Sequence, residues 1–245
     1  MKRFYAASSQ FTAQTVVLDA DETRHLRDVL RLRAGNQARV FDGEGQEFLC
    51  RIAEIGKKET VLEIIEQVAP AAPESRLDLT LAVALLKGEK FDLVVQKACE
   101  LGAARLVPLV TARADVKIRD ASDAAKKLER WRRIVMESSK QCGRAKLMAI
   151  ESPISYEKFV RSVDNVGVLF SEKSGANFES LISASSKIQK ITAFIGSEGG
   201  WEDEEIERAR ACNFHIITLG GRILRAETAA IAITALLQNH FGDLK

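Results

Sequence analysis

Two glycine-bearing segments near the end of the sequence have the residue types needed to hold a small ligand. The first is Gly196-Ser197-Glu198-Gly199-Gly200, and the second is Gly220-Gly221-Arg222. Glycine allows sharp turns and a close approach of the ligand to the backbone. Neither segment has the spacing of a dinucleotide-binding or P-loop motif. Acidic residues 202–205 follow the first segment at the start of a predicted helix, where they would repel phosphate. The pattern therefore indicates a neutral or cationic ligand.

S-adenosylmethionine is a ligand of this kind, because it carries an adenosine and a sulfonium cation and has no phosphate. A plainer interpretation is that both segments are structural turns that close strands. The glycine spacing alone leaves both interpretations open.

Cysteine and histidine are too scattered in the sequence for a metal site. The chain has four cysteines and three histidines, which are Cys50, Cys99, Cys142, Cys212, His25, His215 and His240. A zinc site needs clustered ligands, and these residues are far apart. We expect no metal, and we expect the thiols to be reduced and mostly buried.

Basic residues are concentrated in two parts of a chain whose net charge is only +2. Residues 111–150 contain eleven Lys and Arg against five Asp and Glu, and residues 21–40 contain five Arg. Local basic patches on a nearly neutral protein suit an anionic partner held at defined places. A solvated helix face explains the charge alone equally well.

The first part of the chain is predicted to form a small β-barrel with one helix. Short alternating or β-branched stretches are separated by turn residues, which is typical of a barrel. The predicted strands are residues 15–18, 38–41, 47–52 and 60–64. A helix is expected over residues 21–32, with Arg24, Arg27 and Arg31 on one stripe.

A proline-containing stretch, residues 70–75, is the clearest linker. Beyond it, apolar strands alternate with helices, which predicts a parallel sheet covered on both faces. The expected strands are residues 77–86, 105–110, 166–170, 191–195 and 214–219, and the clearest helices are 91–101 and 121–142. Both glycine segments follow strands, at the edge where such sheets bind ligands.

The last helix is apolar around nearly its whole circumference, as residues 229–233 and 235–237 show. Such a helix must be covered on several sides, which suggests a homodimer. No apolar run reaches the ~18 residues that span a bilayer, and the start lacks the apolar stretch of a signal peptide. We therefore expect a cytoplasmic protein without a membrane segment.

Ordered motifs along the chain resemble the bacterial small-subunit (16S) rRNA uridine-N3 methyltransferases of the SPOUT superfamily. The motifs are Gly196-Ser197-Glu198-Gly199-Gly200-Trp201, Leu219-Gly220-Gly221-Arg222-Ile223-Leu224-Arg225-Ala226-Glu227-Thr228-Ala229, Lys87-Gly88-Glu89-Lys90-Phe91-Asp92 with Gln96-Lys97-Ala98-Cys99-Glu100-Leu101-Gly102, Trp131-Arg132-Arg133-Ile134 through Glu137 with Gln141-Cys142-Gly143-Arg144, Arg3-Phe4-Tyr5, and His25-Leu26-Arg27-Asp28-Val29-Leu30-Arg31-Leu32. One departure is Ser197, where the family usually has proline, and it should loosen the backbone before Glu198.

The resemblance implies an α/β protein with a PUA-like RNA-binding barrel over residues 1–70, a linker over 71–76, and a SPOUT methyltransferase domain with a deep trefoil knot over 77–245. It also implies a homodimer that uses S-adenosylmethionine to methylate N3 of one uridine in 16S rRNA of the small ribosomal subunit. Two rivals stay open. One is a SPOUT methyltransferase acting on tRNA or another rRNA base, and the other is a ribosome-assembly RNA-binding protein without catalysis.

The resemblance also assigns site residues. The cofactor contacts would be Leu169, Phe170, Gly196, Glu198, Gly199, Gly200, Leu219, Gly220, Ile223, Leu224 and Arg225. Arg225, or Arg222, would stabilise the charge of the deprotonated uracil, and Glu227, or Glu198, would orient groups or take the proton. The candidates for RNA phosphate contacts are Arg3, Arg24, Arg27, Arg31, Arg132, Arg133, Lys140 and Arg144.

Overall fold

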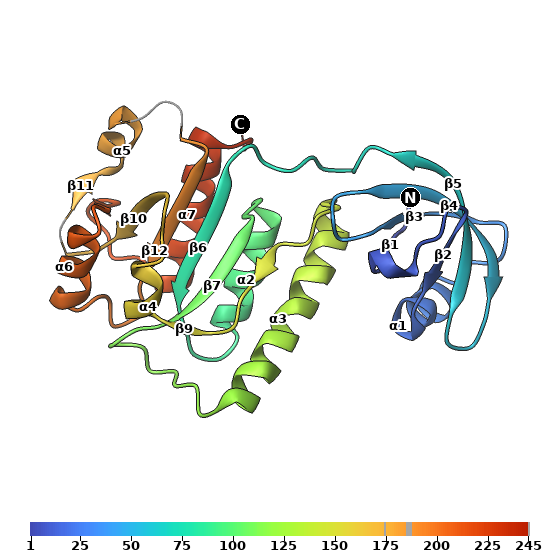
Figure 1. The fold of residues 1–245 in the computed structure, drawn as a ribbon, viewed down its shortest axis with the longest axis horizontal. Coiled ribbons are helices and arrows are strands. Elements are labelled where there is room, and N and C mark those ends of the chain that lie inside the picture. The colour runs from blue at the N-terminus through green and yellow to red at the C-terminus, as the bar shows by residue number, and fades with distance from the viewer. Residues whose placement is uncertain (174, 185–187, 245) are drawn as a thin grey trace. The chain divides into compact units, whose positions relative to one another are not determined.

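The computed structural model describes residues 1–173, 175–184 and 188–244 and divides into two compact units (Figure 1). The first unit comprises Met1–Glu74 and Met136–Leu147, and the second comprises Ser75–Val135 and Met148–Lys245. The chain thus leaves the first unit near the predicted linker and returns to it for one further segment.

The first unit is built on a five-stranded sheet with the order β1-β3-β4-β5-β2. Its strands are β1 (Arg3–Tyr5), β2 (Thr15–Leu18), β3 (Gln37–Phe41), β4 (Glu47–Ile55) and β5 (Thr60–Val68). The pairs are antiparallel except for β1 with β3. Alternate side chains such as Val16, Leu18 and Val40 are fully buried in one core, as the period of two predicts.

The helix predicted over residues 21–32 is only partly correct. Helix α1 (Ala20–Arg24) is capped by the Asp19 carboxylate and passes into a π-helical turn over His25–Val29. There the Leu30 N–H donates to His25 O at 3.0 Å, one residue beyond the α-helical spacing. The chain then turns at Arg31, whose φ is 53°. The single arginine stripe expected from a regular helix is therefore wrong beyond Arg24.

The second unit contains an eight-stranded sheet with the main order β11-β13-β10-β12-β6-β7-β8, and β9 pairs with β7. Every pair in it is parallel. The strands are β6 (Asp78–Ala84), β7 (Arg105–Val110), β8 (Ala149–Ile150), β9 (Ile154–Ser155), β10 (Val166–Phe170), β11 (Ala176–Asn177), β12 (Lys190–Ile195) and β13 (His215–Thr218). The predicted α/β fold with a parallel sheet is confirmed.

Helices cover both faces of this sheet. They are α2 (Lys90–Glu100), α3 (Ala121–Cys142), α4 (Tyr156–Val160), α5 (Phe178–Ala184), α6 (Asp203–Ala211) and α7 (Ala226–Phe241). On one face Leu169 and Phe194 pack with aromatic and aliphatic side chains of α4 and α6, whereas α7 contacts β6 and β12 and packs against α2. No helix within the described ranges is long and apolar enough to cross a membrane.

Helix α3 continues through the boundary between the units. Its residues up to Val135 belong to the second unit, and its last two turns, from Met136, belong to the first. An amphipathic helix with one continuous apolar stripe gives no sequence signal that its two ends serve different cores.

Candidate functional site

A cavity of about 400 Å³ opens at the carboxyl ends of β10, β12 and β13 in the second unit. This is the edge at which parallel sheets bind ligands, and the volume is that of a small-molecule site. Both predicted glycine segments line it, together with the first turns of α7. The two loops are about twenty residues apart in the sequence. They come together because β12 and β13 are both parallel neighbours of β10 and end at the same edge of the sheet.

Most of the predicted cofactor residues lie around this cavity. Those that line it are Phe170, Gly196, Glu198, Gly199, Gly200, Leu219, Gly220, Ile223, Leu224 and Arg225. Leu169 does not, because its side chain is fully buried in the core against the opposite face of the sheet. Glu172 also lines the cavity, although no motif in the sequence pointed to it.

Close packing fixes the shape of the first glycine loop. Gly200 has a φ of +70°, and its N–H donates to Ser197 O at 2.9 Å. A Cβ at Gly200 would collide with the Glu172 carboxylate, and one at Gly196 would lie 3.2 Å from the Trp201 ring. Trp201 is itself fully buried and donates from Nε1 to Phe170 O at 2.9 Å. A side chain at Gly200 would be strained by its positive φ, and one at Gly196 would require the buried Trp201 ring to move.

The second loop presents its side chains to solvent. Gly220 has a φ of +97°, and the residues that follow it are exposed, with Ile223 at 84%. Arg225 is the N-cap residue of α7, with an exposed side chain. The loop therefore places a guanidinium and aliphatic side chains at the mouth of the cavity.

Glu198 is held in its anionic form. Lys90 Nζ donates to Glu198 Oε1 at 2.8 Å, across 108 positions of the sequence. Burial raises the pKa of Glu198, but the hydrogen bond from Lys90 and a backbone hydrogen bond outweigh it, so that the pKa lies below its usual value. A carboxyl group with a lowered pKa is a weak proton acceptor. Lys90 lies within one of the family motifs, but nothing in the sequence indicates that it pairs with Glu198.

Glu227 lies in the opposite situation. It is in the first turn of α7, outside the residues that line the cavity, and its Oε2 is buried without a hydrogen-bond partner among the described residues. A buried carboxylate oxygen without a hydrogen-bond partner is costly to the folded state. Of the two acids predicted to act, Glu198 is held by a cation, whereas Glu227 has an oxygen left without a partner among the described residues.

The lining suits the ligand expected from the sequence. Ile195, Ile217 and Ile233 supply apolar surface, and Glu172 and Glu198 supply carboxylates. Apolar walls fit the adenine of S-adenosylmethionine, and the carboxylates fit its sulfonium cation and ammonium group. Among the residues that the structure describes, no group of three His, Cys, Asp or Glu side chains could hold a metal ion.

Five of the predicted RNA contacts have exposed side chains, namely Arg24, Arg27, Arg31, Arg132 and Arg133. Some form ion pairs at the surface, such as Arg24 with Asp21 at 3.2 Å and Arg133 with Glu129 at 2.9 Å. Surface pairs of this kind are weak and readily exchanged for a phosphate.

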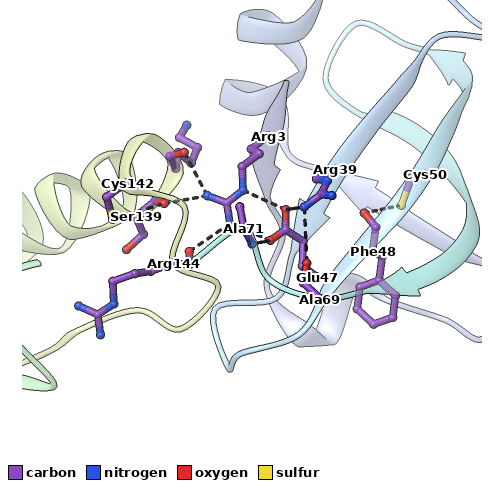
Figure 2. Close-up of polar contacts among 11 residues, drawn as sticks. Arg3, Arg39, Glu47, Phe48, Cys50, Ala69, Ala71, Ser139, Cys142 and Arg144 are labelled. Carbon is purple, nitrogen blue, oxygen red and sulfur yellow. Dashed lines mark hydrogen bonds and ion pairs between the residues drawn. The ribbon is translucent and has the colours of Figure 1, made fainter. Parts of the chain in front are cut away.

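The other three predicted RNA contacts are engaged within the first unit. Arg3 donates to both carboxylate oxygens of the fully buried Glu47, at 3.0 and 3.1 Å. Figure 2 shows its guanidinium between Glu47 and the end of α3, where it also donates to Ser139 O at 2.8 Å. The guanidinium lies 4.7 Å from the centre of the Phe41 ring.

Lys140 and Arg144 are buried in the same way. Lys140 donates to Glu22 at 2.6 Å, and Arg144 donates to Glu74 at 2.6 Å. Burial raises the pKa of Glu22 although Lys140 opposes the shift. Charge and spacing in the sequence could not distinguish these buried ion pairs from exposed basic residues, since their partners are 70 to 118 positions away.

Two family models match the chain. A model described as an RNA methyltransferase domain matches residues 73–238, and one described as an RNA methyltransferase PUA domain matches residues 18–65.

Relatives match over nearly the full length. Ribosomal RNA small subunit methyltransferase E of Synechocystis sp. is 34% identical, over 97% of this chain and 78% of the relative. The protein of the same name from Rickettsia conorii is 32% identical, over 99% of this chain and 98% of the relative.

Solved structures agree with these sequence matches. One from Neisseria gonorrhoeae, named ribosomal RNA small subunit methyltransferase E and bound to S-adenosylmethionine, is 31% identical, with a TM-score of 0.90 and 100% of both chains covered. A second, from Legionella pneumophila, is described as a methyltransferase in complex with S-adenosylmethionine. It is 33% identical, with a TM-score of 0.90, 99% of this chain and 98% of the other being covered.

Proposed function

The chain belongs to the RNA methyltransferase family of ribosomal RNA small subunit methyltransferase E, and we propose that it methylates N3 of one uridine in 16S rRNA. It is an S-adenosylmethionine-dependent ribosomal RNA methyltransferase. The observation that carries this function is the cavity formed by the two glycine loops at the carboxyl ends of the parallel strands.

The two loops would hold the cofactor mainly through their backbone. The residues we assign to it are Phe170, Gly196, Glu198, Gly199, Gly200, Leu219, Gly220, Ile223, Leu224 and Arg225. Leu169 would contribute through its position in β10 rather than through its buried side chain. The bound cofactor would supply the methyl group, and its sulfonium would become neutral when that group is transferred.

Arg225 and Glu227 are the residues we assign to the chemistry. Uracil N3 is a poor nucleophile until its imide proton is removed, and removal leaves negative charge on the ring. The Glu227 carboxylate, whose Oε2 lacks a partner among the described residues, would take that proton. The exposed Arg225 guanidinium at the cavity mouth would stabilise the ring charge.

The remaining assignments concern the RNA and the assembly. We assign phosphate contacts to the exposed Arg24, Arg27, Arg31, Arg132 and Arg133 and leave out the buried Arg3, Lys140 and Arg144. The domains would be a PUA-like barrel over 1–70, a linker over 71–76 and a SPOUT domain with a trefoil knot over 77–245. A homodimer acting in the cytoplasm, where ribosomes are, completes the proposal.

The proposal is tested by transfer of an isotopically labelled methyl group. The purified protein is incubated with labelled S-adenosylmethionine and either 16S rRNA or small subunits, and the digested nucleosides are analysed by mass spectrometry. Labelled N3-methyluridine is expected from at least one of the two substrates. A different labelled nucleoside would contradict the N3 assignment, and binding of the cofactor with no transfer to either RNA would favour the non-catalytic alternative.

A further inference from the structure

The segment after β7, residues 111–115, lies against the first glycine loop and exchanges hydrogen bonds with it. The Ser197 hydroxyl donates to Arg113 O at 3.0 Å. In return, Arg113 Nη1 donates to Gly199 O at 3.2 Å, and Arg113 Nε lies 3.8 Å from the Glu202 carboxylate. The segment and the loop, whose bonded residues are 84 and 86 positions apart in the sequence, are thus joined in both directions.

The contact is close as well as polar. A Cβ at Gly199 would lie 3.0 Å from Arg113 Cβ and 3.2 Å from Arg113 O. Only glycine therefore fits at this point of the loop while the segment stays in place. Ser197 is buried, so its hydroxyl would be costly to leave without an acceptor.

The backbone next to Arg113 is held in place by a buried carboxylate. The neighbouring Ala112 N–H donates to Glu205 Oε1 at 3.1 Å. The buried Glu205 also accepts from the Glu202 N–H at 2.9 Å, which closes the capping box of α6, and its carbonyl accepts from the Tyr156 hydroxyl at 2.6 Å. The Glu205 carboxylate therefore binds both the segment that carries Arg113 and the start of α6. The glycine loop lies between these two elements.

We propose that Arg113 and Ser197 form a clamp that holds the first glycine loop in the shape that receives the cofactor. Arg113 is a positioning residue, because it lies outside the cavity lining and acts through the backbone of the loop. Ser197 lines the cavity and also fixes the loop through its bond to Arg113 O, and Lys90 holds the adjacent Glu198. The identity of the ligand rests on the proposed function, whereas the clamp itself does not.

The two arms of the clamp can be removed separately. Ser197→Ala removes the hydroxyl, and Arg113→Ala removes the guanidinium while leaving the backbone acceptor. Ser197→Thr keeps a hydroxyl and should restore binding. Arg119→Ala is the matched control, because Arg119 is in the same stretch, is 82% exposed and lies 3.9 Å from its partner Asp123.

Calorimetry with S-adenosylmethionine gives the first measurement. Removal of one hydrogen bond should raise the dissociation constant about threefold to tenfold. The KM for S-adenosylmethionine should rise by the same factor in Ser197→Ala and in Arg113→Ala, while kcat changes less than twofold in both. RNA affinity and the Arg119→Ala control should stay at the wild-type level.

The second measurement is hydrogen exchange of the peptide that contains residues 196–201, without cofactor. Exchange of the Gly200 amide, which donates to Ser197 O, should be faster in Ser197→Ala and Arg113→Ala than in the wild type. Wild-type exchange and wild-type affinity in both variants would overturn the clamp. Failure of the wild-type protein to bind S-adenosylmethionine would overturn the proposed function instead, and the exchange comparison would still decide the clamp.

Discussion

Two carboxylates near the cavity differ in what surrounds them, and this difference separates their roles. Glu198 accepts a hydrogen bond from Lys90, whereas Glu227 Oε2 is buried without a partner among the described residues. Acids placed in different environments can perform different steps in one site. We therefore assign binding of a cationic ligand to Glu198 and proton transfer to Glu227.

Glu227→Gln should lower kcat about 100-fold to 10,000-fold, which is the usual contribution of a positioned base. The dissociation constant for S-adenosylmethionine should be unchanged, since Glu227 does not line the cavity. Single-turnover kinetics and calorimetry measure the two effects. Full turnover in Glu227→Gln would show that the proton is taken by another group.

Lys90→Met should make cofactor binding more sensitive to acid. In the wild type the hydrogen bond from Lys90 lowers the pKa of Glu198, so the carboxylate stays anionic as the pH falls. Without Lys90 the carboxyl should become protonated at a higher pH, and affinity should be lost there. Calorimetry from pH 4 to pH 7 measures the shift. Lys97→Met is the control, because Lys97 is on the same helix as Lys90 and pairs with Glu100 at 2.7 Å instead. Identical pH profiles for the two variants would contradict the prediction.

Residue types near the ligand could be predicted from the sequence, but their partners could not. The spacing of Gly196, Gly199 and Gly200 indicates a close backbone approach without knowledge of the fold. The contacts of Glu198 with Lys90 and of Ser197 with Arg113 depend on which loops the sheet brings together. No local pattern encodes such pairs.

At the scale of elements, the end of α3 is built into the first unit by ion pairs. Arg3 binds Glu47 and carbonyls at the end of the helix, Lys140 binds Glu22, and Arg144 binds Glu74. Removal of one partner of a buried pair leaves an uncompensated charge, which is more harmful than loss of a surface pair.

Lys140→Met should lower the free energy of unfolding by about 3–5 kcal/mol, because the Glu22 carboxylate would remain buried without its cation. Urea denaturation measures the change, and Arg132→Met, at an exposed position of the same helix, should change it by less than about 0.5 kcal/mol. Equal effects of the two variants would contradict a structural role for Lys140.

The pair of Lys140 and Glu22 also predicts that the free energy of unfolding falls at alkaline pH. Burial lowers the pKa of Lys140, but hydrogen bonds to Glu137 and Glu22 outweigh it, so the folded-state pKa lies above 10.5. Its stabilising contribution is therefore complete below pH 10.5 and is lost as the pH rises through the folded-state value. In Lys140→Met this loss should be absent.

Regular, strongly periodic elements were predicted more accurately than irregular ones. The helix expected over 121–142 matches α3, and the apolar run in 191–195 matches β12 to within one residue. The helix expected over 21–32 was too long, since the wider turn at His25–Val29 and the left-handed Arg31 have no periodic signal.

In the whole molecule, a PUA-like part is followed by a methyltransferase part, as the two family models indicate. The periodicity of apolar residues predicted the parallel sheet. It does not indicate that residues 136–147 return to the first unit.

We expect the proposed homodimer to form through the face made by α2 and α7. Leu93 on α2 and Leu236 on α7 are 38% and 40% exposed, and the two helices contact each other. Light scattering should give the mass of a dimer at micromolar concentration, and Leu236→Glu should shift it towards the monomer. A monomeric mass for the wild type at all micromolar concentrations would contradict the dimer.

Methylation of small-subunit ribosomal RNA at uridine N3 can be tested by mass spectrometry of nucleosides from 16S rRNA, in cells with and without this gene. We predict that N3-methyluridine disappears when the gene is absent and returns with the wild-type gene but not with Glu227→Gln. An undiminished N3-methyluridine signal in cells without the gene would contradict the claim.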